Sequence, residues 1–267
     1  MIPLWPCLPA LERELCSTGR LVLLLDFDGT LAPIARRPED VSLTPRVRAL
    51  LNSLACCPGV TVAIVSGRAL PDLRTRAAVK GLVYAGNHGL EISGGGICYA
   101  HPEALARREA LARLCEHVEG ELHPFAGARI ENKGLTATVH YRLVAEQDRD
   151  RLRGAVQAAS RSLGPGFVLR SGRCSLEIRP DVDWNKGNAA QYILERLSGP
   201  GAMTFCFGDD QTDEDAFAAL PEAITVRVGA AEERTSAKYC LEDPMEVART
   251  LERLFAVVSS AAVAEAS

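Results

Sequence analysis

The chain has 267 residues, of which 47% are hydrophobic and 24% are charged, and its formal net charge is −4. This composition excludes global disorder and allows one large α/β domain, or a domain that carries a smaller inserted one. The sequence has no basic stripe of the kind that binds nucleic acid and no apolar run of 18 residues, so neither nucleic-acid binding nor a transmembrane helix is expected.

The nine cysteines are irregularly spaced, and the neighbours Cys56 and Cys57 suit neither an ordinary disulfide nor a zinc site. Most cysteines are therefore expected to be small buried residues in a reducing compartment. Segment 1–16 lacks the basic flank and apolar stretch of a signal peptide. These patterns predict a cytoplasmic protein.

Apolar runs alternate with helical segments along most of the chain, and they predict strands that are covered on both faces. The runs are 21–25, 60–65, 203–207 and 224–228. Helices are expected to begin at Pro45, behind the N-cap Thr44, and near Ala69, Asn185 and Met245. The alternation predicts a doubly wound α/β core with a parallel sheet. Residues 256–267 are expected to fray.

The middle of the chain has a different pattern. Helices are predicted at 102–122 and 144–163, and strands at 135–142, 167–170 and 174–178. Two of these strands alternate between apolar and polar residues, which is typical of antiparallel sheets with one solvated face. We therefore expect a small α+β domain at 101–180, inserted into a core made of 1–100 and 181–267. The polar face of its sheet would either face water or offer a surface for a sugar.

The segment 26–31 (DFDGTL) directly follows the first apolar run. Ligands bind at the carboxyl ends of strands in open α/β sheets. Of the two carboxylates at that position, Asp26 and Asp28, one can attack phosphorus and the other can shuttle protons, so that one hard displacement becomes two easier ones. The alternative is an Asp-rich turn that caps a helix.

Two further segments could hold a phosphate. Ser66 and Gly67 end the second apolar run, where a hydroxyl and a backbone N–H can bind phosphate oxygens. Lys186, at the start of a predicted helix, can neutralise the nucleophile and the transferring phosphoryl group. Read in isolation, these residues would be an ordinary turn and a surface lysine.

The acidic segment 208–215 follows the third apolar run and contains Asp209 and Asp213. If it packs beside Asp26 and Asp28, the repulsion between carboxylates requires a cation, and hard oxygen ligands together with a substrate phosphate indicate Mg²⁺. The alternative is a solvated acidic helix start, which the helix dipole favours. That alternative explains the last two acids of the segment better than it explains Asp209, which precedes the helix.

The order of these motifs resembles that of the haloacid dehalogenase (HAD) superfamily of phosphotransferases, whose members cover the active site with an inserted cap domain. Longer motifs resemble the trehalose-6-phosphate phosphatases. They are 87–91 (NHGLE), 131–134 (ENKG), 140–142 (HYR), 176–180 (LEIRP) and 185–187 (NKG). The resemblance extends over about residues 20–230.

This resemblance implies a magnesium-dependent phosphatase that hydrolyses trehalose 6-phosphate in trehalose biosynthesis, through an aspartyl-phosphate. Asp26 would be the nucleophile and Asp28 the general acid and base. The metal would be held by the Asp26 carboxylate, the Asp28 carbonyl and Asp209, with Asp213 as a supporting acid. Ser66, Gly67 and Lys186 would hold the phosphate. The residues that would bind the substrate are Asn87, His88, Glu131, Lys133, Arg142, Arg173 and Glu177.

The chain departs from the family pattern after Gly172, where two lysines are expected and Arg173 and Cys174 stand. Arginine keeps the charge but differs from lysine in geometry. Two other functions stay open: a related phosphatase for sucrose phosphate or mannosyl-phosphoglycerate, and a non-catalytic domain that binds a sugar phosphate. The expected partner is a small sugar phosphate, and the expected state is a free-standing monomer without nucleic acid or membrane.

Overall fold

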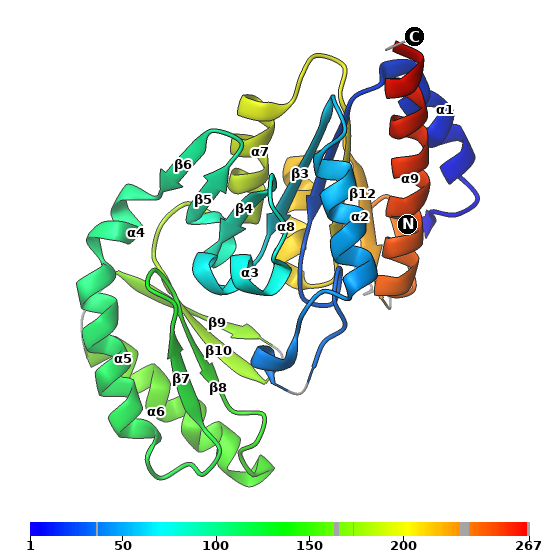
Figure 1. Ribbon diagram of the computed structural model, residues 1–267. Coiled ribbons are helices and arrows are strands. Elements are labelled where there is room, and N and C mark those ends of the chain that lie inside the picture. The colour runs from blue at the N-terminus through cyan, green and yellow to red at the C-terminus, as the bar shows by residue number, and fades with distance from the viewer. Residues whose placement is uncertain (36, 163–165, 173, 230–234, 266–267) are drawn as a thin grey trace. The chain divides into compact units, whose positions relative to one another are not determined.

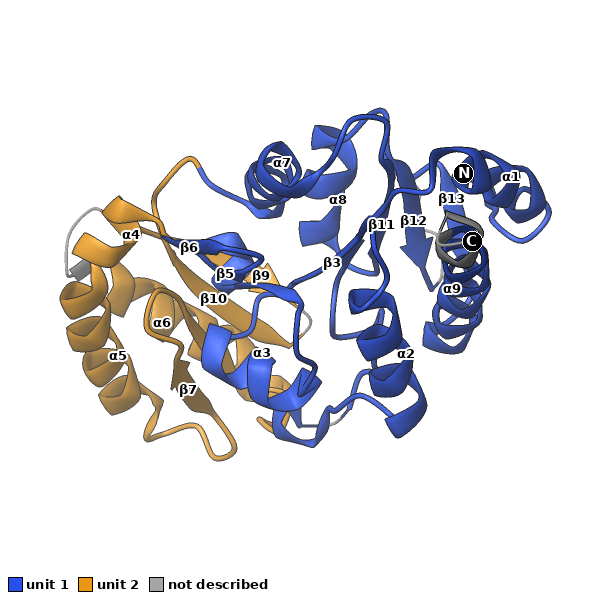
Figure 2. Ribbon diagram, turned by 45° about the horizontal axis from the view of Figure 1, so that its top comes forward, with its two compact units in different colours: residues 1–99, 184–267 blue, residues 100–183 orange. Residues whose placement is uncertain are grey.

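The computed structural model describes all residues except 36, 163–165, 173, 230–234 and 266–267. The chain divides into two compact units (Figure 2). Unit 1 contains Met1–Tyr99 and Trp184–Ser267, and unit 2 contains Ala100–Asp183. Each unit has its own hydrophobic core. Arg173, one of the predicted substrate residues, lies outside the described residues.

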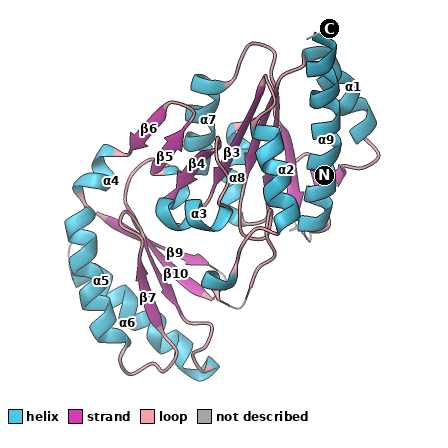
Figure 3. Cartoon of the chain, viewed as in Figure 1, coloured by secondary structure: helices cyan, strands magenta, loops and turns pink. Residues whose placement is uncertain are grey.

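Unit 1 is built on a nine-stranded sheet in the order β1-β13-β12-β11-β2-β3-β4-β5-β6. Figure 3 draws the strands in magenta and labels β3, β4, β5 and β6 of this sheet. In this spatial order, every pair of neighbouring strands from β1 through β13, β12, β11, β2 and β3 to β4 is parallel, and β5 is antiparallel to β4. The strands are β1 (Ile2–Pro3), β2 (Leu21–Leu25), β3 (Val60–Val65), β4 (Val83–Gly86), β5 (Glu91–Gly94), β6 (Ile97–Ala100), β11 (Met203–Gly208), β12 (Ile224–Val228) and β13 (Tyr239–Leu241). The parallel α/β core expected from the sequence is confirmed.

Helices cover both faces of this sheet (Figure 1). They are α1 (Leu8–Thr18), α2 (Pro45–Ala55), α3 (Leu70–Ala77), α7 (Lys186–Leu197), α8 (Gln211–Ala219) and α9 (Pro244–Glu265). Leu21, Leu23 and Leu25 pack with α1, α2, α3 and α9, whereas Val22 and Leu24 pack with α7 and α8. Successive residues of β2 therefore enter two separate cores, which explains why the run is apolar throughout.

The prediction that residues 256–267 fray is wrong for 256–265, because α9 continues to Glu265. Val258 is buried in the same core as α1 and α2, and Arg253 donates to Glu12 of α1 at 2.6 Å. Packing against α1 therefore keeps this segment helical. Within the described residues, none of the helices combines the length and the apolar character that crossing a membrane requires.

Unit 2 is a four-stranded antiparallel sheet in the order β7-β8-β10-β9, with helices packed on its apolar face. Its elements are α4 (Pro102–Ala106), α5 (Arg108–Leu122), β7 (Arg129–Asn132), β8 (Ala137–His140), α6 (Arg149–Ser162), β9 (Phe167–Gly172) and β10 (Ser175–Pro180). Val139 and Ile178 contribute to the core beneath α5 and α6. The helix predicted at 102–122 is interrupted at Arg107, where ψ is 0°.

The polar side of β8 is more enclosed than its alternation indicates. Thr138 is 4% exposed, and in the strand register it lies between Glu131 of β7 and Glu177 of β10. Because β8 is an inner strand, side chains flank it on both sides. The alternation of a single strand does not reveal that position.

Candidate active site

The candidate site lies where the parallel strands β2, β3, β4 and β11 end. Asp26 follows β2, Ser66 follows β3, Asn87 follows β4 and Asp209 follows β11. These strands are neighbours in the sheet and run in the same direction. Their carboxyl ends therefore share one edge, which is where open α/β sheets bind ligands.

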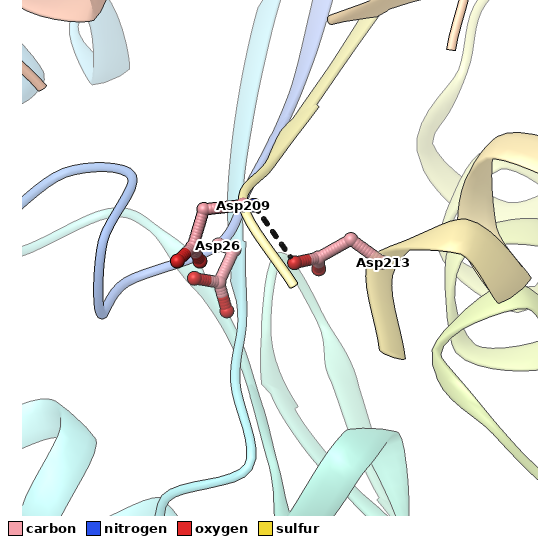
Figure 4. Close-up of side chains that lie close together, drawn as sticks. All are labelled: Asp26, Asp209 and Asp213. Carbon is pink, nitrogen blue, oxygen red and sulfur yellow. Dashed lines mark hydrogen bonds between the residues drawn. The ribbon is translucent and has the colours of Figure 1, made fainter. Parts of the chain in front are cut away.

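Three carboxylates gather at this edge (Figure 4). Oxygens of Asp26, Asp209 and Asp213 lie within 4.8 Å of one another. Asp213 reaches the site from α8, and its Oδ2 accepts from the backbone N–H of Asp209 at 3.0 Å. A Cβ on Gly29 would lie 2.1 Å from Oδ2 of Asp209, so only glycine leaves room for that carboxylate.

Lys186 is the cation within this cluster. Its Nζ donates to Oδ1 of Asp26 and to Oδ1 of Asp213, both at 2.7 Å, and the residue is 3% exposed. Burial lowers the pKa of Lys186, but Asp213 and Asp26 outweigh it and raise the pKa well above its ordinary value. The ammonium is therefore charged at neutral pH. Asn185 caps α7 and accepts from the N–H of Gly187 at 2.8 Å, which sets Lys186 at the first residue of the helix.

When Asp26, Asp209 and Asp213 are all ionised, they carry more negative charge than the ammonium of Lys186 neutralises. Burial raises the pKa of Asp26, and the neighbours Asp213 and Asp209 raise it further against the effect of Lys186. Burial, Asp213 and Asp210 raise the pKa of Asp209 to about 7. Burial raises the pKa of Asp213 to about 6 against the effect of Lys186. A set of hard oxygen donors with excess negative charge fits Mg²⁺.

Asp28 lies on the loop after β2 and is held by Arg68. Nε of Arg68 donates to Oδ2 of Asp28 and Nη2 donates to Oδ1, both at 2.6 Å. Arg68 also donates to Asp72 at 2.8 Å and to the carbonyl of Pro38 at 2.8 Å. Sequence reasoning did not single out Arg68. Its position after the apolar run 60–65 was an available signal. A buried arginine at a strand end needs carboxylate partners, and the 26–31 segment offers them.

The loops after β3 and β4 are tied together by backbone hydrogen bonds. The N–H of Asn87 donates to the carbonyl of Arg68 at 2.7 Å, and the N–H of His88 donates to the carbonyl of Ser66 at 2.9 Å. Asn87 and His88 have φ of 50° and 59°, which is uncommon for residues other than glycine. A Cβ on Gly67 would lie 2.5 Å from Cε1 of His88, so the imidazole packs directly on this glycine. The structure thus brings together the four predicted residues Ser66, Gly67, Asn87 and His88.

The remaining predicted residues lie in unit 2. Glu131 of β7 and Glu177 of β10 share one face of the sheet through their common neighbour Thr138. Glu131 accepts from Nε2 of His140 at 2.9 Å, and Glu177 forms an ion pair with Arg179. Lys133 and Arg142 follow β7 and β8, and Arg142 is exposed.

Sequence comparison relates this chain to phosphatases that act on trehalose phosphate. The sequence model of the trehalose-phosphatase family matches residues 24–245. A trehalose-phosphate phosphatase of Mycobacterium avium is 39% identical over 246 residues, which cover 87% of this chain and 61% of that protein. An uncharacterized glycosyl hydrolase of Mycobacterium tuberculosis is 38% identical over 253 residues, which cover 91% of this chain and 19% of that protein. The chain thus spans less than two thirds of the length of these relatives.

Solved structures share the fold. A trehalose-6-phosphate phosphatase related protein superposes with a TM-score of 0.79 at 26% identity, over 90% of this chain and 99% of that one. The C-terminal domain of trehalose-6-phosphate phosphatase from C. albicans superposes with a TM-score of 0.80 at 23% identity, over 93% of this chain and 96% of that domain. At 23% identity, the second likeness concerns the fold alone.

Proposed function

This chain belongs to the trehalose-phosphatase family, and from that premise we propose that it hydrolyses trehalose 6-phosphate to trehalose and phosphate. The observation that carries the proposal is the contact of Lys186 with Asp26 at 2.7 Å, within a cluster of carboxylates at the carboxyl edge of the parallel sheet. A buried carboxylate beside a fixed ammonium is suited to attack on phosphorus, because the ammonium balances the charge that develops.

In the first step the Asp26 carboxylate attacks phosphorus. An acyl phosphate forms on Asp26, and the bond between phosphorus and the sugar oxygen breaks. Asp28 gives its proton to the leaving oxygen, so that trehalose departs as a neutral alcohol. In the structure Arg68 donates to both oxygens of Asp28 and so holds this side chain as a carboxylate, the form that acts as the base in the second step. Proton donation in the first step therefore requires Asp28 to release one of these contacts.

In the second step Asp28, now a carboxylate, takes a proton from a water molecule that attacks the phosphorus of the acyl phosphate. Phosphate leaves, and the carboxylate of Asp26 is restored. Lys186 neutralises the transferring phosphoryl group in both steps. Ser66 and the backbone of Gly67 bind the remaining phosphate oxygens.

We propose that Mg²⁺ is the cofactor. The Asp26 carboxylate, the Asp28 carbonyl and the Asp209 carboxylate would hold it, and Asp213 would support them. The proposal rests on the excess of buried carboxylate charge and on the oxygen-only donor set. When bound, the ion would supply positive charge next to the phosphoryl oxygens.

We assign recognition of the sugar to a cap domain at about 101–180, with Asn87 and His88 contributing from the core. Glu131, Lys133, Arg142, Arg173 and Glu177 would bind hydroxyl groups through charge-assisted hydrogen bonds. The shared sheet face of Glu131 and Glu177 supports this assignment. A cap that binds another sugar would leave the chemistry of the core unchanged. The identity of the substrate is therefore tested separately from the mechanism.

The test is phosphate release from purified protein, with Mg²⁺ or with EDTA, from trehalose 6-phosphate, sucrose 6-phosphate, glucose 6-phosphate and p-nitrophenyl phosphate. We expect Mg²⁺-dependent release with a preference for trehalose 6-phosphate, and loss of turnover in Asp26→Asn with the fold retained. A preference for another sugar phosphate would overturn the substrate. Activity of Asp26→Asn near that of the wild type would overturn the nucleophile, and no release from any compound would favour a binding domain.

A further inference from the structure

An aromatic cluster lies where the chain leaves unit 1 and returns to it. Tyr99 is the last residue of unit 1 before unit 2, and Trp184 is the first one after it. Their rings stack with centroids 5.1 Å apart and an interplanar angle of 28°. Tyr192 of α7 packs against both rings, with centroid distances of 4.6 Å to Tyr99 and 6.1 Å to Trp184.

Trp184 connects this cluster to two parts of the candidate site. Its Nε1 donates to the carbonyl of Gly89 at 2.9 Å, at the end of the Asn87–Gly89 turn. The turn packs tightly on α7, since a Cβ on Gly89 would lie 2.2 Å from Cβ of Ala189. Trp184 also stands two residues before Lys186, the partner of Asp26.

We propose that Trp184 is a positioning residue, which holds the Asn87–Gly89 turn and the start of α7 in register across the phosphate site. This inference rests on the proposed function and goes beyond it, because it assigns a role in that site to a residue that the proposed mechanism does not use. One hydrogen bond joins Trp184 to the turn that carries His88, and the backbone joins it to Lys186. The indole therefore links the turn to the segment before Lys186, beside the direct packing of Gly89 on Ala189.

The consequence differs from that of ordinary core packing. Loss of a core contact lowers stability and leaves the site unchanged in molecules that remain folded. Loss of the indole N–H would instead loosen the turn relative to α7 in the folded protein. Small misplacements of catalytic groups cost large factors in rate. We therefore expect kcat to fall while the melting temperature changes little.

The experiment compares Trp184→Phe, which keeps an aromatic ring but lacks the N–H donor, with Trp5→Phe. Trp5 is the other tryptophan of the chain, and its Nε1 has no hydrogen-bond partner among the described residues. The measurements are hydrogen–deuterium exchange of peptides covering 86–90 and 185–189, affinity for inorganic phosphate, kcat and KM for trehalose 6-phosphate, and melting temperature.

We expect Trp184→Phe to exchange faster in both peptides and to lose about tenfold in kcat or in phosphate affinity, the factor that corresponds to one hydrogen bond. Trp5→Phe should leave the exchange of both peptides, kcat and phosphate affinity unchanged. The inference is overturned if exchange in the two peptides matches the wild type, or if exchange rises while kcat and phosphate affinity stay unchanged. A wild type that binds phosphate but hydrolyses no sugar phosphate would refute the proposed function, and the inference would then be judged by exchange and phosphate affinity.

Discussion

Arg68 and Asp28 form a two-point contact between the loops that follow β3 and β2. The flat guanidinium meets both carboxylate oxygens at 2.6 Å, and Arg68 is itself 8% exposed. Such a contact sets the direction of the carboxylate as well as its position, because both groups are planar and rigid. The proposed acid and base is thus oriented by a residue that touches no phosphate in the proposed mechanism.

We predict that Arg68→Lys lowers kcat for trehalose 6-phosphate by ten- to a hundredfold, on the order of what a misplaced catalytic group costs. Lysine keeps the positive charge but cannot hold both oxygens of Asp28 in one plane. Steady-state kinetics should show the loss mainly in kcat. The control is Arg76→Lys, since Arg76 of α3 shares the partner Asp72, at 2.7 Å, but does not contact Asp28. Equal losses in the two variants would contradict the orienting role of Arg68.

The sequence could predict which residues stand at the carboxyl edge but not how they pair. Asp26, Ser66 and Asp209 follow apolar runs, and strand direction alone brings such residues together. The pairing of Arg68 with Asp28 joins loops 40 positions apart. It depends on the path of each loop, which no local pattern encodes. The two hydrogen bonds of Lys186, to Asp26 and to Asp213, depend in the same way on how α7 packs against α8.

At the scale of elements, prediction succeeded where burial alone decides the pattern. The runs at 21–25, 60–65 and 224–228 are β2, β3 and β12 with the same bounds. Prediction failed where tertiary packing decides, as in the end of α9, which carries a weak helical pattern but contributes Val258 to the core that contains α1. The β5–β6 hairpin was also missed, because the positive φ values of Gly94, Gly95 and Gly96 belong to a turn that resembles a plain loop in sequence.

The N-terminus of α8 shows how an element can serve stability and the site together. Asp210 is its N-cap and accepts from the N–H of Thr212 at 2.8 Å and from that of Asp213 at 3.3 Å. Asp213 in turn accepts from the backbone N–H of Asp209 and Asp210 at 3.0 and 3.1 Å. The cap therefore fixes the turn from which both Asp209 and Asp213 enter the acidic cluster.

We predict that Asp210→Ala lowers the free energy of unfolding by about 1 kcal/mol, the usual cost of a lost N-cap, and also lowers kcat. Thr44→Ala is the matched control, because Thr44 caps α2 by accepting from the N–H of Val47 at 3.3 Å, outside the candidate site. Urea unfolding should give similar losses for the two variants, whereas kinetics should change only for Asp210→Ala. Asp210→Ser retains a capping oxygen and should recover most of the stability. An unchanged kcat in Asp210→Ala would show that the cap acts on the helix alone.

At the scale of the whole molecule, the proposed chemistry lies in unit 1, whereas most residues of the proposed sugar recognition lie in unit 2. Unit 1 contains the acidic cluster, Lys186 and the Arg68–Asp28 contact, together with the sheet and helices that position them. Unit 2 contains Glu131 and Glu177 on a sheet with its own core. The two ends of unit 1 at the break are close, since the rings of Tyr99 and Trp184 are 5.1 Å apart. A short linker can therefore replace unit 2.

We predict that replacing residues 101–182 with a short Gly-Ser linker leaves a folded protein that still hydrolyses p-nitrophenyl phosphate, within about tenfold of the full chain, because that substrate has no sugar hydroxyls to bind. Hydrolysis of trehalose 6-phosphate should fall by on the order of a hundredfold or more in kcat/KM, since the polar groups that select the sugar are gone. Circular dichroism and thermal melting check the fold, and Asp26→Asn in the shortened chain shows that residual turnover uses the same nucleophile. If the shortened chain is folded and loses both activities equally, unit 2 is needed for the chemistry itself. If it keeps its preference for trehalose 6-phosphate, the sugar is recognised by unit 1, and the substrate roles of Glu131 and Glu177 are wrong.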